Sequence, residues 1–462
     1  MNKLRITLKD RKRFVCPAAM AAVLVLLAAG ANALAVNNTV WTVSKASSNL
    51  TCSAPSHTTC NTISAAVSAA LSGDIIVVGP GKYNESVTIS TDSLSLFGAQ
   101  AGRDPRGCRD GHDKESDARQ CRDGHDNESI VDAGTTGNPA FSITVPYVVI
   151  DGFTIENGGG SFPAGIFMVG SDLESVSGLQ VVNNIIKDNG VGVFLLYTLG
   201  NVVERNLIKD NNNPGTGTGA GYGVIAGISF ASSINDNEFC GNQAAAITID
   251  IAEFDVITNN TSENDGSFAI FVDTEGGVFK HNQGRNFGAK GVLPVSLNDT
   301  PVNADAAVDI GYGNQILEIS DNDLEEGEGT ISNGIAFTTI FGTSQDSEGV
   351  VIKDNTIKGF KCNGVVAEAA SGQGMTRYSS LVANEIKENG QYGINIQAAT
   401  TSNTNISFFD NEAVGNGVLD CNDDSVASGP SGYTLGTHDT WFNDIGKSSY
   451  PTGICTARGW EH

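Results

Sequence analysis

Short apolar stretches that end in asparagine and glycine recur along most of the chain. The stretch from Gly178 to Gly192, GLQVVNNIIKDNGVG, shows the unit: an apolar pair leads to Asn184, and a second asparagine follows at Asn189. The first asparagine of this unit is found at nine positions, namely Asn184, Asn206, Asn237, Asn260, Asn282, Asn322, Asn355, Asn384 and Asn411. Three residues before each of them stands a large apolar residue, in order Val181, Val203, Ile234, Ile257, Phe279, Ile319, Ile352, Leu381 and Phe408.

This repeat predicts a solenoid in which each unit forms one coil. Consecutive anchor asparagines are 22 to 40 residues apart, and the β-branched residues between them alternate as in short strands. Coils of this kind are typical of a parallel β-helix, and the crossover rule for parallel strands makes it right-handed. We therefore expect an all-β fold in which the anchor asparagines are scaffold. Asparagine tolerates the left-handed backbone of a sharp corner, and stacked amides can hydrogen-bond from coil to coil.

The N-terminal residues show the pattern of an exported protein. Residues 1–35 place six basic residues before an apolar stretch and a run of small residues, which predicts a secretory signal peptide. No later stretch has the apolar length that a membrane span requires. Residues 36–102 are expected to form an N-terminal cap and the first coils. Within them Ile63, Ala66 and Val67 fall on one face of a short predicted helix, with Asn61 or Thr62 as its N-cap.

The segment after this helix carries a family resemblance. It reads GDIIVVGPGKYNESVTI from Gly73, and Leu94 to Ala99 form the next short strand, LSLFGA. At these residues the chain resembles secreted parallel β-helix proteins of the pectate-lyase-like family, also described as carbohydrate-binding and sugar-hydrolase β-helix domains. The resemblance extends over residues 60–420. It implies a carbohydrate-facing surface, but the catalytic motifs of the enzymatic branches of the family are not found in the sequence.

The cysteines predict disulfides. Cys16 lies in the signal peptide, and the eight that remain are an even set in an exported chain. Closeness in sequence suggests the pairs Cys52–Cys60, Cys108–Cys121 and Cys421–Cys455. Elimination then leaves Cys240–Cys362, which would connect distant coils.

A tandem duplication interrupts the pattern at residues 103–129. The segment CRDGHDKE from Cys108 returns as CRDGHDNE from Cys121. Two interpretations are open, a disulfide hairpin and a metal site. The ligands of the metal site would be His112, Asp113, His125 and Asp126.

After the parallel β-helix at residues 130–418, residues 419–462 are expected to form a C-terminal cap closed by a disulfide. Asp420, Asp423 and Asp424 of this cap are candidate ligands for Ca²⁺, the one cofactor that the sequence suggests. A solvated acidic turn is the alternative interpretation, because the spacing does not match an EF-hand loop.

The chain is strongly acidic. Its formal net charge is −25, and loss of the six basic residues and Asp10 with residues 1–35 makes it −30. Such a surface repels nucleic acid, anionic lipid and polyuronide unless cations intervene. We therefore expect no nucleic-acid partner and no membrane span. The expected protein is a monomer, secreted to the extracellular space or the periplasm, whose partner is a polysaccharide or a cell-surface glycan.

Stacking the repeats in register brings candidate chemistry together. One and two residues before the anchors stand Lys280, His281, Asp321, Lys353 and Asp354, on three consecutive repeats. Lys or His can act as a general base, and carboxylates can hydrolyse a glycoside or hold a cation. The alternative is a polar outer surface with ion pairs between neighbouring strands.

Three functions follow from this sequence. The first is an exported β-helix protein that associates with carbohydrate at the cell surface or outside the cell. The second is a polysaccharide lyase or glycoside hydrolase that acts in a lateral groove through the Lys280 to Asp354 patch. The third is a structural or adhesive rod without catalysis. Whether the protein is an enzyme remains open at this point.

Overall fold

The structure is a computed structural model that describes residues 38–46, 52, 57–106, 127–134, 136–160, 163–171, 176–212, 221–288, 306–327, 329–337, 346–368, 376–397, 405–424 and 439–457. The chain divides into a unit of residues 1–38 and a unit of residues 39–462. The predicted signal peptide and the duplicated loop from Cys108 to Asp126 lie outside the described residues. In the part that is described, no helix is long and apolar enough to cross a membrane.

Three parallel sheets run through the second unit, and each coil contributes one strand to each sheet. Sheet 1 has 15 strands. In spatial order these are β2 (Thr59–Cys60), β1 (Val40–Val43), β3 (Ile75–Val78), β6 (Ser95–Phe97), β9 (Val149–Asp151), β12 (Gln180–Val182), β15 (Val202–Glu204), β18 (Ser233–Asn235), β21 (Val256–Thr258), β24 (Val278–Lys280), β27 (Glu318–Ser320), β31 (Val351–Lys353), β35 (Ser380–Val382), β38 (Ser407–Phe409) and β41 (Thr440–Phe442).

Sheet 2 has 12 strands and follows sheet 1 after a two-residue corner in most coils. Its strands are β4 (Gly81–Tyr83), β7 (Ser129–Asp132), β10 (Phe153–Glu156), β13 (Ile185–Lys187), β16 (Leu207–Lys209), β19 (Glu238–Cys240), β22 (Thr261–Glu263), β25 (Gln283–Arg285), β28 (Asp323–Glu325), β32 (Thr356–Lys358), β36 (Glu385–Lys387) and β39 (Glu412–Val414).

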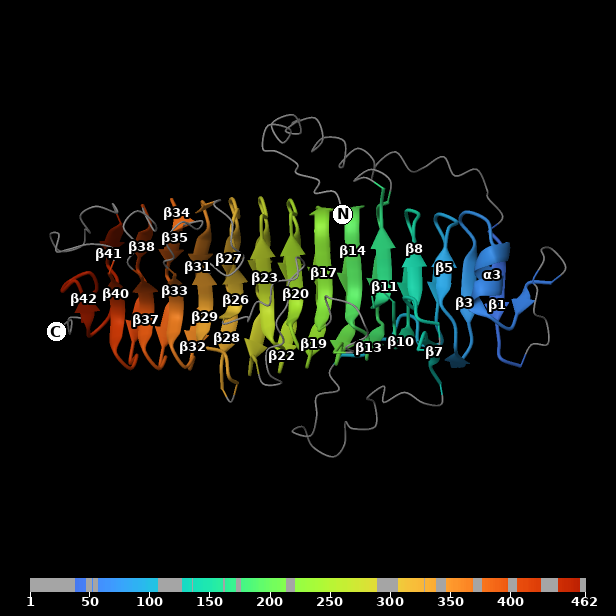
Figure 1. The fold of residues 1–462 in the computed structure, drawn as a ribbon, viewed down its shortest axis with the longest axis horizontal. Helices are drawn as coiled ribbons and strands as arrows, with labels where there is room; N and C mark the ends of the chain where they lie inside the picture. The colour runs from blue at the N-terminus through green and yellow to red at the C-terminus, as the bar shows by residue number, and fades with distance from the viewer. Residues whose placement is uncertain are drawn as a thin grey trace. The chain divides into compact units, whose positions relative to one another are not determined.

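Sheet 3 has 13 strands and contains the longest ones. They are β5 (Val87–Ile89), β8 (Phe141–Ile143), β11 (Ala164–Val169), β14 (Val191–Leu199), β17 (Tyr222–Phe230), β20 (Ala245–Asp250), β23 (Ser267–Val272), β26 (Ala306–Ile310), β29 (Asn333–Phe337), β33 (Asn363–Ala367), β37 (Tyr392–Ile396), β40 (Leu419–Asp423) and β42 (Ser449–Tyr450). A separate pair joins β30 (Ser347–Glu348) to β34 (Thr376–Arg377). Figure 1 shows successive coils side by side from the blue strands to the red ones.

The all-β prediction is therefore confirmed, and the strands of each sheet pair in parallel. Among the described residues there is one helix, α3 (Ile63–Ala69), which begins after Thr62 as N-cap. The Thr62 side chain accepts a hydrogen bond from the Ala65 N–H at 3.2 Å. Ile63, Ala66 and Val67 of this helix are buried, as their spacing predicts, and α3 contacts β5, β1, β2 and β3.

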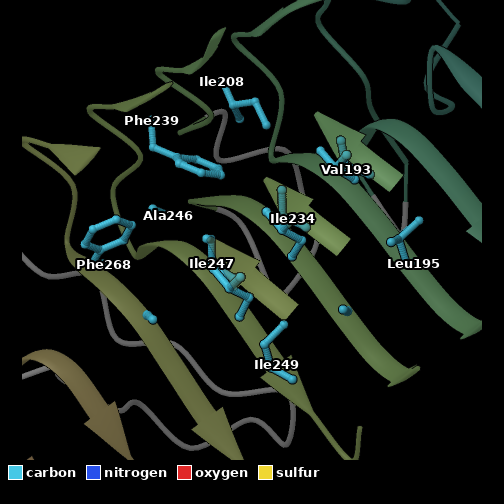
Figure 2. Packing of buried hydrophobic residues seen from close by; sticks show 14 of the residues in the cluster. Val193, Leu195, Ile208, Ile234, Phe239, Ala246, Ile247, Ile249 and Phe268 are labelled. Carbon is cyan, nitrogen blue, oxygen red and sulfur yellow. The ribbon is translucent and has the colours of Figure 1, made fainter. Parts of the chain in front are cut away.

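The core lies between the three sheets. Most strands turn one or two side chains inward, so that successive coils add layers of aliphatic and aromatic residues to a continuous cluster. Figure 2 shows Ile234 from sheet 1, Ile208 and Phe239 from sheet 2, and Ile247 and Ile249 from sheet 3 pointing toward one another. All nine apolar residues three before the anchors are buried at 1% exposure or less. Burial of this column explains why its residues are without exception large and apolar.

The anchor asparagines form an unbroken ladder at the corner between sheet 1 and sheet 2. The Asn260 side chain is typical: its Oδ1 accepts from the Asn237 N–H and Nδ2, and its own Nδ2 donates to Asn282 Oδ1 and the Ile234 carbonyl. The ladder runs through all nine anchors and ends at Asp444. Asp444 Oδ1 accepts from Asn411 Nδ2 at 2.7 Å, and its Oδ2 accepts from the Phe442 N–H at 3.0 Å.

The left-handed residue of this corner is not the anchor but the residue before it. All nine preceding residues, from Asn183 to Asp410, have φ between 52° and 56°. The expectation that the anchor asparagine itself adopts this backbone is corrected. The anchor is selected for its amide, and the residue before it for tolerance of positive φ.

A second asparagine ladder at the corner between sheet 2 and sheet 3 is interrupted. One segment runs from Asn189 through Asn211 and Asn242 to Asp265, and another runs from Asn389 through Asn416 to Asp420. Between them Phe287 and Phe360 stand at the equivalent place, five residues after Asn282 and Asn355, and both are buried.

Glu326 is buried in this interruption. Its Oε1 accepts from the Ile331 N–H at 3.0 Å, while its Oε2 has no hydrogen-bond partner among the described residues. Burial raises the pKa of this carboxyl to about 8, more than its backbone hydrogen bonds lower it. Glu326 is therefore protonated at neutral pH in the folded protein.

Two of the predicted disulfides are present, Cys52–Cys60 and Cys421–Cys455. Cys108 and Cys121 lie outside the described residues. The predicted pair Cys240–Cys362 is wrong: no disulfide joins these residues. Cys240 lies on β19 and Cys362 follows β32, four coils farther along sheet 2. At ~4.8 Å per coil the separation is beyond the ~7 Å between Cα atoms that a disulfide spans.

The two corner positions give a matched test of the ladder. Asn260→Asp should lower the free energy of unfolding by at least about 3 kcal/mol, because a carboxylate cannot donate to Asn282 Oδ1 and the Ile234 carbonyl. Asn259→Asp, one residue earlier, should change it by less than about 1 kcal/mol, because four other coils carry Asp there. Urea unfolding at pH 7 measures both. Equal effects at the two positions would contradict the ladder as the stabilising feature.

The buried Glu326 predicts a pH dependence. Its folded pKa lies above the unfolded value, so its contribution is greatest below about pH 4.5 and is lost as the pH rises toward about 8. The slope is up to about 1.4 kcal/mol per pH unit. Glu326→Gln should match the parent protein at pH 5 and be more stable at pH 8 in urea unfolding. A stability difference that does not vary with pH would show that Glu326 is ionised in the folded protein.

Candidate functional site

The outer face of sheet 3 carries side chains that are buried although they point away from the core. On β20, Ile247 and Ile249 turn inward, and Thr248 and Asp250 alternate with them on the outer side. A second apolar cluster forms on this outer side and includes Phe194, Tyr222 and Ile270. Shielded polar and apolar groups on one face are the composition of a ligand site.

One row of this face continues in register from coil to coil. Parallel pairing joins Phe194 of β14, Ile225 of β17, Thr248 of β20, Ile270 of β23 and Asp309 of β26. Each of these residues is less than 10% exposed. The Thr248 hydroxyl has no hydrogen-bond partner among the described residues, although it is buried. A buried hydroxyl of this kind is costly unless a ligand or water completes it.

Asp250 and Asp273 end neighbouring strands beside this row. Burial, and to a smaller degree the nearby charge of Asp273, raise the pKa of Asp250 to about 7. The pKa of the Tyr312 hydroxyl is also raised, by burial first and then by the charges of Asp250 and Asp273. Burial likewise raises the pKa of Tyr222, with a smaller contribution from Asp250. Asp250, Asp273 and the Tyr312 phenol therefore lie near one another, whereas Tyr222 pairs in register with Ala245, at the other end of β20.

A third carboxyl group, Asp309, lies on β26 at 1% exposure. Its Oδ2 is 2.9 Å from Ser267 Oγ, which also lies 2.8 Å from the Ala306 carbonyl oxygen. Ser267 therefore fixes the orientation of the Asp309 carboxyl. The Asp309 side chain is adjacent to Ile270 in the same row as Thr248.

The backbone next to the carboxyl groups is strained. Tyr197, Ile228, Ile251 and Asp273 occupy equivalent places on consecutive coils and have φ between 49° and 56°. Positive φ is unusual for a β-branched residue, and it applies here to two isoleucines. Strain of this kind persists where the surrounding structure enforces it, and it is concentrated at functional sites.

Toward the last coils the outer face of sheet 3 becomes a row of amides. Asn363 Nδ2 donates to Asn333 Oδ1 at 2.7 Å, Asn395 Nδ2 donates to Asn363 Oδ1 at 3.2 Å, and Asn422 Nδ2 donates to Asn395 Oδ1 at 3.0 Å. These asparagines are not anchors of either corner ladder. They lie on the same sheet as Asp309, but the apolar residues Ala336 and Val366 stand in register between Asp309 and Asn395.

The residues that the sequence proposed as catalytic lie elsewhere, on sheet 1 and its corner with sheet 2. The structure brings them together: Lys280 pairs in register with Ser320, and Ser320 with Lys353. Lys280 Nζ is 3.1 Å from Asp321 Oδ2, and His281 Nε2 is 3.7 Å from the same oxygen. Lys353 Nζ instead pairs with Glu318 Oε1 at 3.2 Å.

The residue types of this patch have a structural explanation. His281, Asp321 and Asp354 all belong to the left-handed corner column, with φ of 56°, 53° and 55°. Asn, Asp and His are enriched at positive φ. The ion pairs are partly exposed, as expected of neighbouring strands on an outer surface. Corner geometry therefore accounts for these residues without catalysis.

The predicted calcium ligands do not converge. Asp420 accepts hydrogen bonds from the side chain and backbone of Asn416 and from the Lys447 N–H. Asp423 Oδ2 accepts from Trp441 Nε1 at 3.1 Å, and Asp424 is exposed. Over the described ranges, no three His, Cys, Asp or Glu residues gather as a metal site. His112, Asp113, His125 and Asp126 lie outside those ranges.

Comparison with known proteins identifies the architecture. A family model described as "Periplasmic copper-binding protein (NosD)" matches residues 147–283, which is less than a third of the chain. The chain is a parallel β-helix protein. The family description agrees with the expected location in the periplasm or outside the cell. No curated protein sequence matches the chain.

Solved structures with the same fold are carbohydrate-active enzymes. The catalytic domain of a GH87 α-1,3-glucanase variant in complex with tetrasaccharides is 14% identical, with a TM-score of 0.54 over 81% of this chain and 66% of that domain. A mannuronic acid specific polysaccharide family 6 lyase from human gut microbiota is 10% identical, with a TM-score of 0.52 over 85% of this chain and 83% of that one. At these identities the similarity shows the fold alone.

Sequence reasoning missed the carboxyl cluster because it read only the positions next to the anchor asparagines. Asp250 and Asp273 each stand 13 residues after an anchor, Asn237 and Asn260, at the far ends of the sheet 3 strands. Alignment on the sheet 3 strands themselves, AAITID and SFAIFV, would have placed Asp250 and Asp273 one residue apart on adjacent coils.

The unpartnered hydroxyl of Thr248 gives a test of the outer face. Thr248→Val removes a buried polar group and keeps its shape, so the free energy of unfolding should stay equal or rise by about 1 kcal/mol. Ser229→Ala is the matched control, because the Ser229 hydroxyl is equally buried but donates to Asp255 Oδ2, and its loss should destabilise. Thermal unfolding measures both variants. A clear loss of stability in Thr248→Val would show that the hydroxyl is satisfied in the folded protein.

Proposed function

We propose that this protein is a glycoside hydrolase that acts outside the cytoplasm on an uncharged polysaccharide, with its active site on the outer face of sheet 3. The observation that carries the proposal is the pair Asp250 and Asp273 on adjacent strands, in which burial and the nearby Asp273 charge raise the pKa of Asp250 to about 7. Glycoside hydrolysis requires this combination of an acid and a carboxylate. For the coil we infer the right-handed sense, from the crossover rule for parallel strands.

The two carboxyl groups would have separate roles. Asp250 would donate its proton to the glycosidic oxygen as the bond from the anomeric carbon to that oxygen breaks. Ionised Asp273 would take a proton from water as the water oxygen bonds to the anomeric carbon, so one water is consumed for each bond cleaved. The phenol of Tyr312 would supply hydrogen-bonding and stacking surface for the sugar.

Charge favours hydrolysis of a neutral glycan over cleavage of a polyuronide. A lyase must neutralise the carboxylate of its substrate, and here Asp250 and Asp273 lie close together on a chain of net charge −25. Such a field repels a polyanionic substrate. Carbohydrate association is also what the enzymes of the same fold have in common.

Copper, which the name of the matching family model mentions, does not fit the described residues. They contain no group of three His, Cys, Asp or Glu that could hold a metal ion, and the hydrolytic step assigned to Asp250 and Asp273 uses none.

The test is hydrolysis of a panel of neutral polysaccharides, measured as new reducing ends. Asp250→Asn should lower kcat by about 100- to 10,000-fold with little change in the melting temperature. Activity of the parent protein should fall above about pH 7, as Asp250 loses its proton. Asp410→Asn, at an exposed corner position where other coils carry Asn, is the control and should leave kcat unchanged.

A second variant separates the two candidate sites. His281→Asn retains a residue type that occurs at the same corner position in other coils, and it removes the imidazole beside Asp321. It should leave hydrolysis unchanged if the outer face of sheet 3 is the site. If His281→Asn lost activity and Asp250→Asn kept full activity, the active site would be the sheet 1 patch and not the outer face of sheet 3. Unsaturated products that absorb in the ultraviolet would show a lyase and overturn the proposal.

A further inference from the structure

The connection from sheet 3 to sheet 1 turns at a third left-handed corner, and its occupants are unusual. Among the described residues they are, in order along the coils, Ser93, Tyr147, Gly178, Gly200, Ala231, Phe254, Gly276, Ile316, Gly349, Tyr378 and Asn405, all with φ between 49° and 68°. Backbone hydrogen bonds link each coil to the next at this corner, which places these residues in one column. Phe254 N–H, for example, donates to the Glu275 carbonyl at 2.8 Å, and Ile316 N–H donates to the Glu348 carbonyl at 3.1 Å.

Glycine and alanine are the residues that this backbone favours, but four coils carry a large apolar residue instead. Left-handed backbone costs about 1–2 kcal/mol for a residue with a side chain, and for β-branched Ile316 it is a genuine outlier. Burial of the side chains does not offset this free-energy cost, because all four are largely exposed: Tyr147 is 60%, Phe254 42%, Ile316 67% and Tyr378 65% exposed. Conformational preference and the hydrophobic effect both oppose these side chains here. Their presence therefore points to a function.

Three of these residues alternate with glycine. Phe254, Ile316 and Tyr378 are each separated by one coil, and the intervening residues are Gly276 and Gly349. At ~4.8 Å per coil, they recur about every 10 Å along the column. The glycine between them leaves room: a Cβ on Gly276 would lie 2.6 Å from the Phe254 ring. The Phe254 ring therefore lies along the column over the next corner, and this orientation leaves part of its surface exposed.

We propose that Phe254, Ile316 and Tyr378 form a docking ridge for an extended, uncharged polysaccharide chain of β-1,4-linked pyranoses. The C–H face of a pyranose ring is apolar and packs on a flat aromatic or aliphatic surface. In an extended chain of this linkage the same ring face returns every second sugar, and the length of that disaccharide matches the two-coil spacing of the ridge. The regular spacing thus selects a polymer rather than a single small ligand.

The charged residues next to the ridge further restrict the class of polysaccharide that can bind. The residues immediately before the ridge column are Glu253, Glu275, Gln315 and Glu348, which pair from coil to coil at the same corner. A row of carboxylates beside the rings repels polyuronides and nucleic acids and leaves hydrogen-bond acceptors for the hydroxyl groups of a neutral sugar.

The ridge lies beside the carboxyl cluster in the chain. Phe254 follows Asp250 by four residues, and Ile316 follows Tyr312 by four. A glycan held on the ridge would thus run past the outer end of sheet 3. Binding itself does not depend on the proposed hydrolysis, so the two ideas can fail separately.

The experiment measures retention of the mature protein on insoluble cellulose and its affinity for cellohexaose by titration calorimetry. The test variant is the triple substitution Phe254→Gly, Ile316→Gly and Tyr378→Gly. It should weaken cellohexaose binding at least tenfold and leave the melting temperature equal or higher, because glycine relieves the left-handed backbone. The double variant Phe254→Ala with Tyr378→Ala introduces the residue type that Ala231 already provides in the same column. This double variant should also lose affinity for cellohexaose, and it replaces the triple variant in the test if the triple variant folds poorly.

Two controls define the ridge. Phe442→Ala removes an aromatic residue that is 59% exposed on β41, away from this column, and should bind as the parent protein does. Asp250→Asn should bind cellohexaose with unchanged affinity, even though it should not hydrolyse glycan, which separates the ridge from the active site.

Several outcomes would overturn the proposal. Unchanged affinity in both ridge variants, no binding of cellohexaose or cellulose by the parent protein, or preferential binding of polygalacturonate would each do so. The alternative occupant of the ridge is a second copy of this chain, and sedimentation velocity would detect the resulting dimer. A parent protein that dimerises, with a triple variant that is monomeric, would assign the ridge to contact between two copies of the chain.

Discussion

The coil-to-coil hydrogen bonds of the asparagine ladder are the constraint on which the rest of this structure depends. A two-residue corner between sheet 1 and sheet 2 leaves peptide groups inside the protein that no strand can pair. Each anchor amide satisfies two of them, as Asn260 does by accepting from the Asn237 N–H and donating to the Ile234 carbonyl, and the anchors are no more than 2% exposed. The apolar residue three positions earlier fills the core, and the left-handed residue one position earlier makes the turn. Coil length can then vary elsewhere without disturbing this corner.

The functional proposals depend on this difference between the invariant corner and the parts of each coil that vary. The short corners fix two sheets rigidly, and the third sheet and its connection to sheet 1 carry the variation. Long strands, strained strand ends, buried carboxyl groups and exposed rings all occur on this side. Groups that are unfavourable by themselves, such as a protonated Asp250 and a left-handed Ile316, are tolerable here because the ladder stabilises the coils that hold them.

The sequence predicts the fold well because the fold is repetitive. The anchor column, the apolar column and the helix after Thr62 could be recognised from spacing alone, since each reflects a local requirement that returns in every coil. The same repetition misled the search for chemistry. Stacking on the anchors drew attention to His281, Asp321 and Asp354, whose types follow from backbone geometry. Asp250 and Asp273 share a spacing of 13 residues from their anchors, but they stand out as candidates only once their burial and proximity are known.

The aspartates that end the ladders have an evolutionary consequence. Every side-chain amide in the main ladder accepts hydrogen bonds from the coil before it and donates one to the coil after it, so the chain of hydrogen bonds is directional. Ionised Asp444 accepts hydrogen bonds but cannot donate, which suits the last position of the ladder in the described residues, and Asp420 does the same for the second ladder. Coils can therefore be gained or lost by duplication within the ladder without creating an unsatisfied group. Growth beyond Asp444 would first require that residue to become an asparagine.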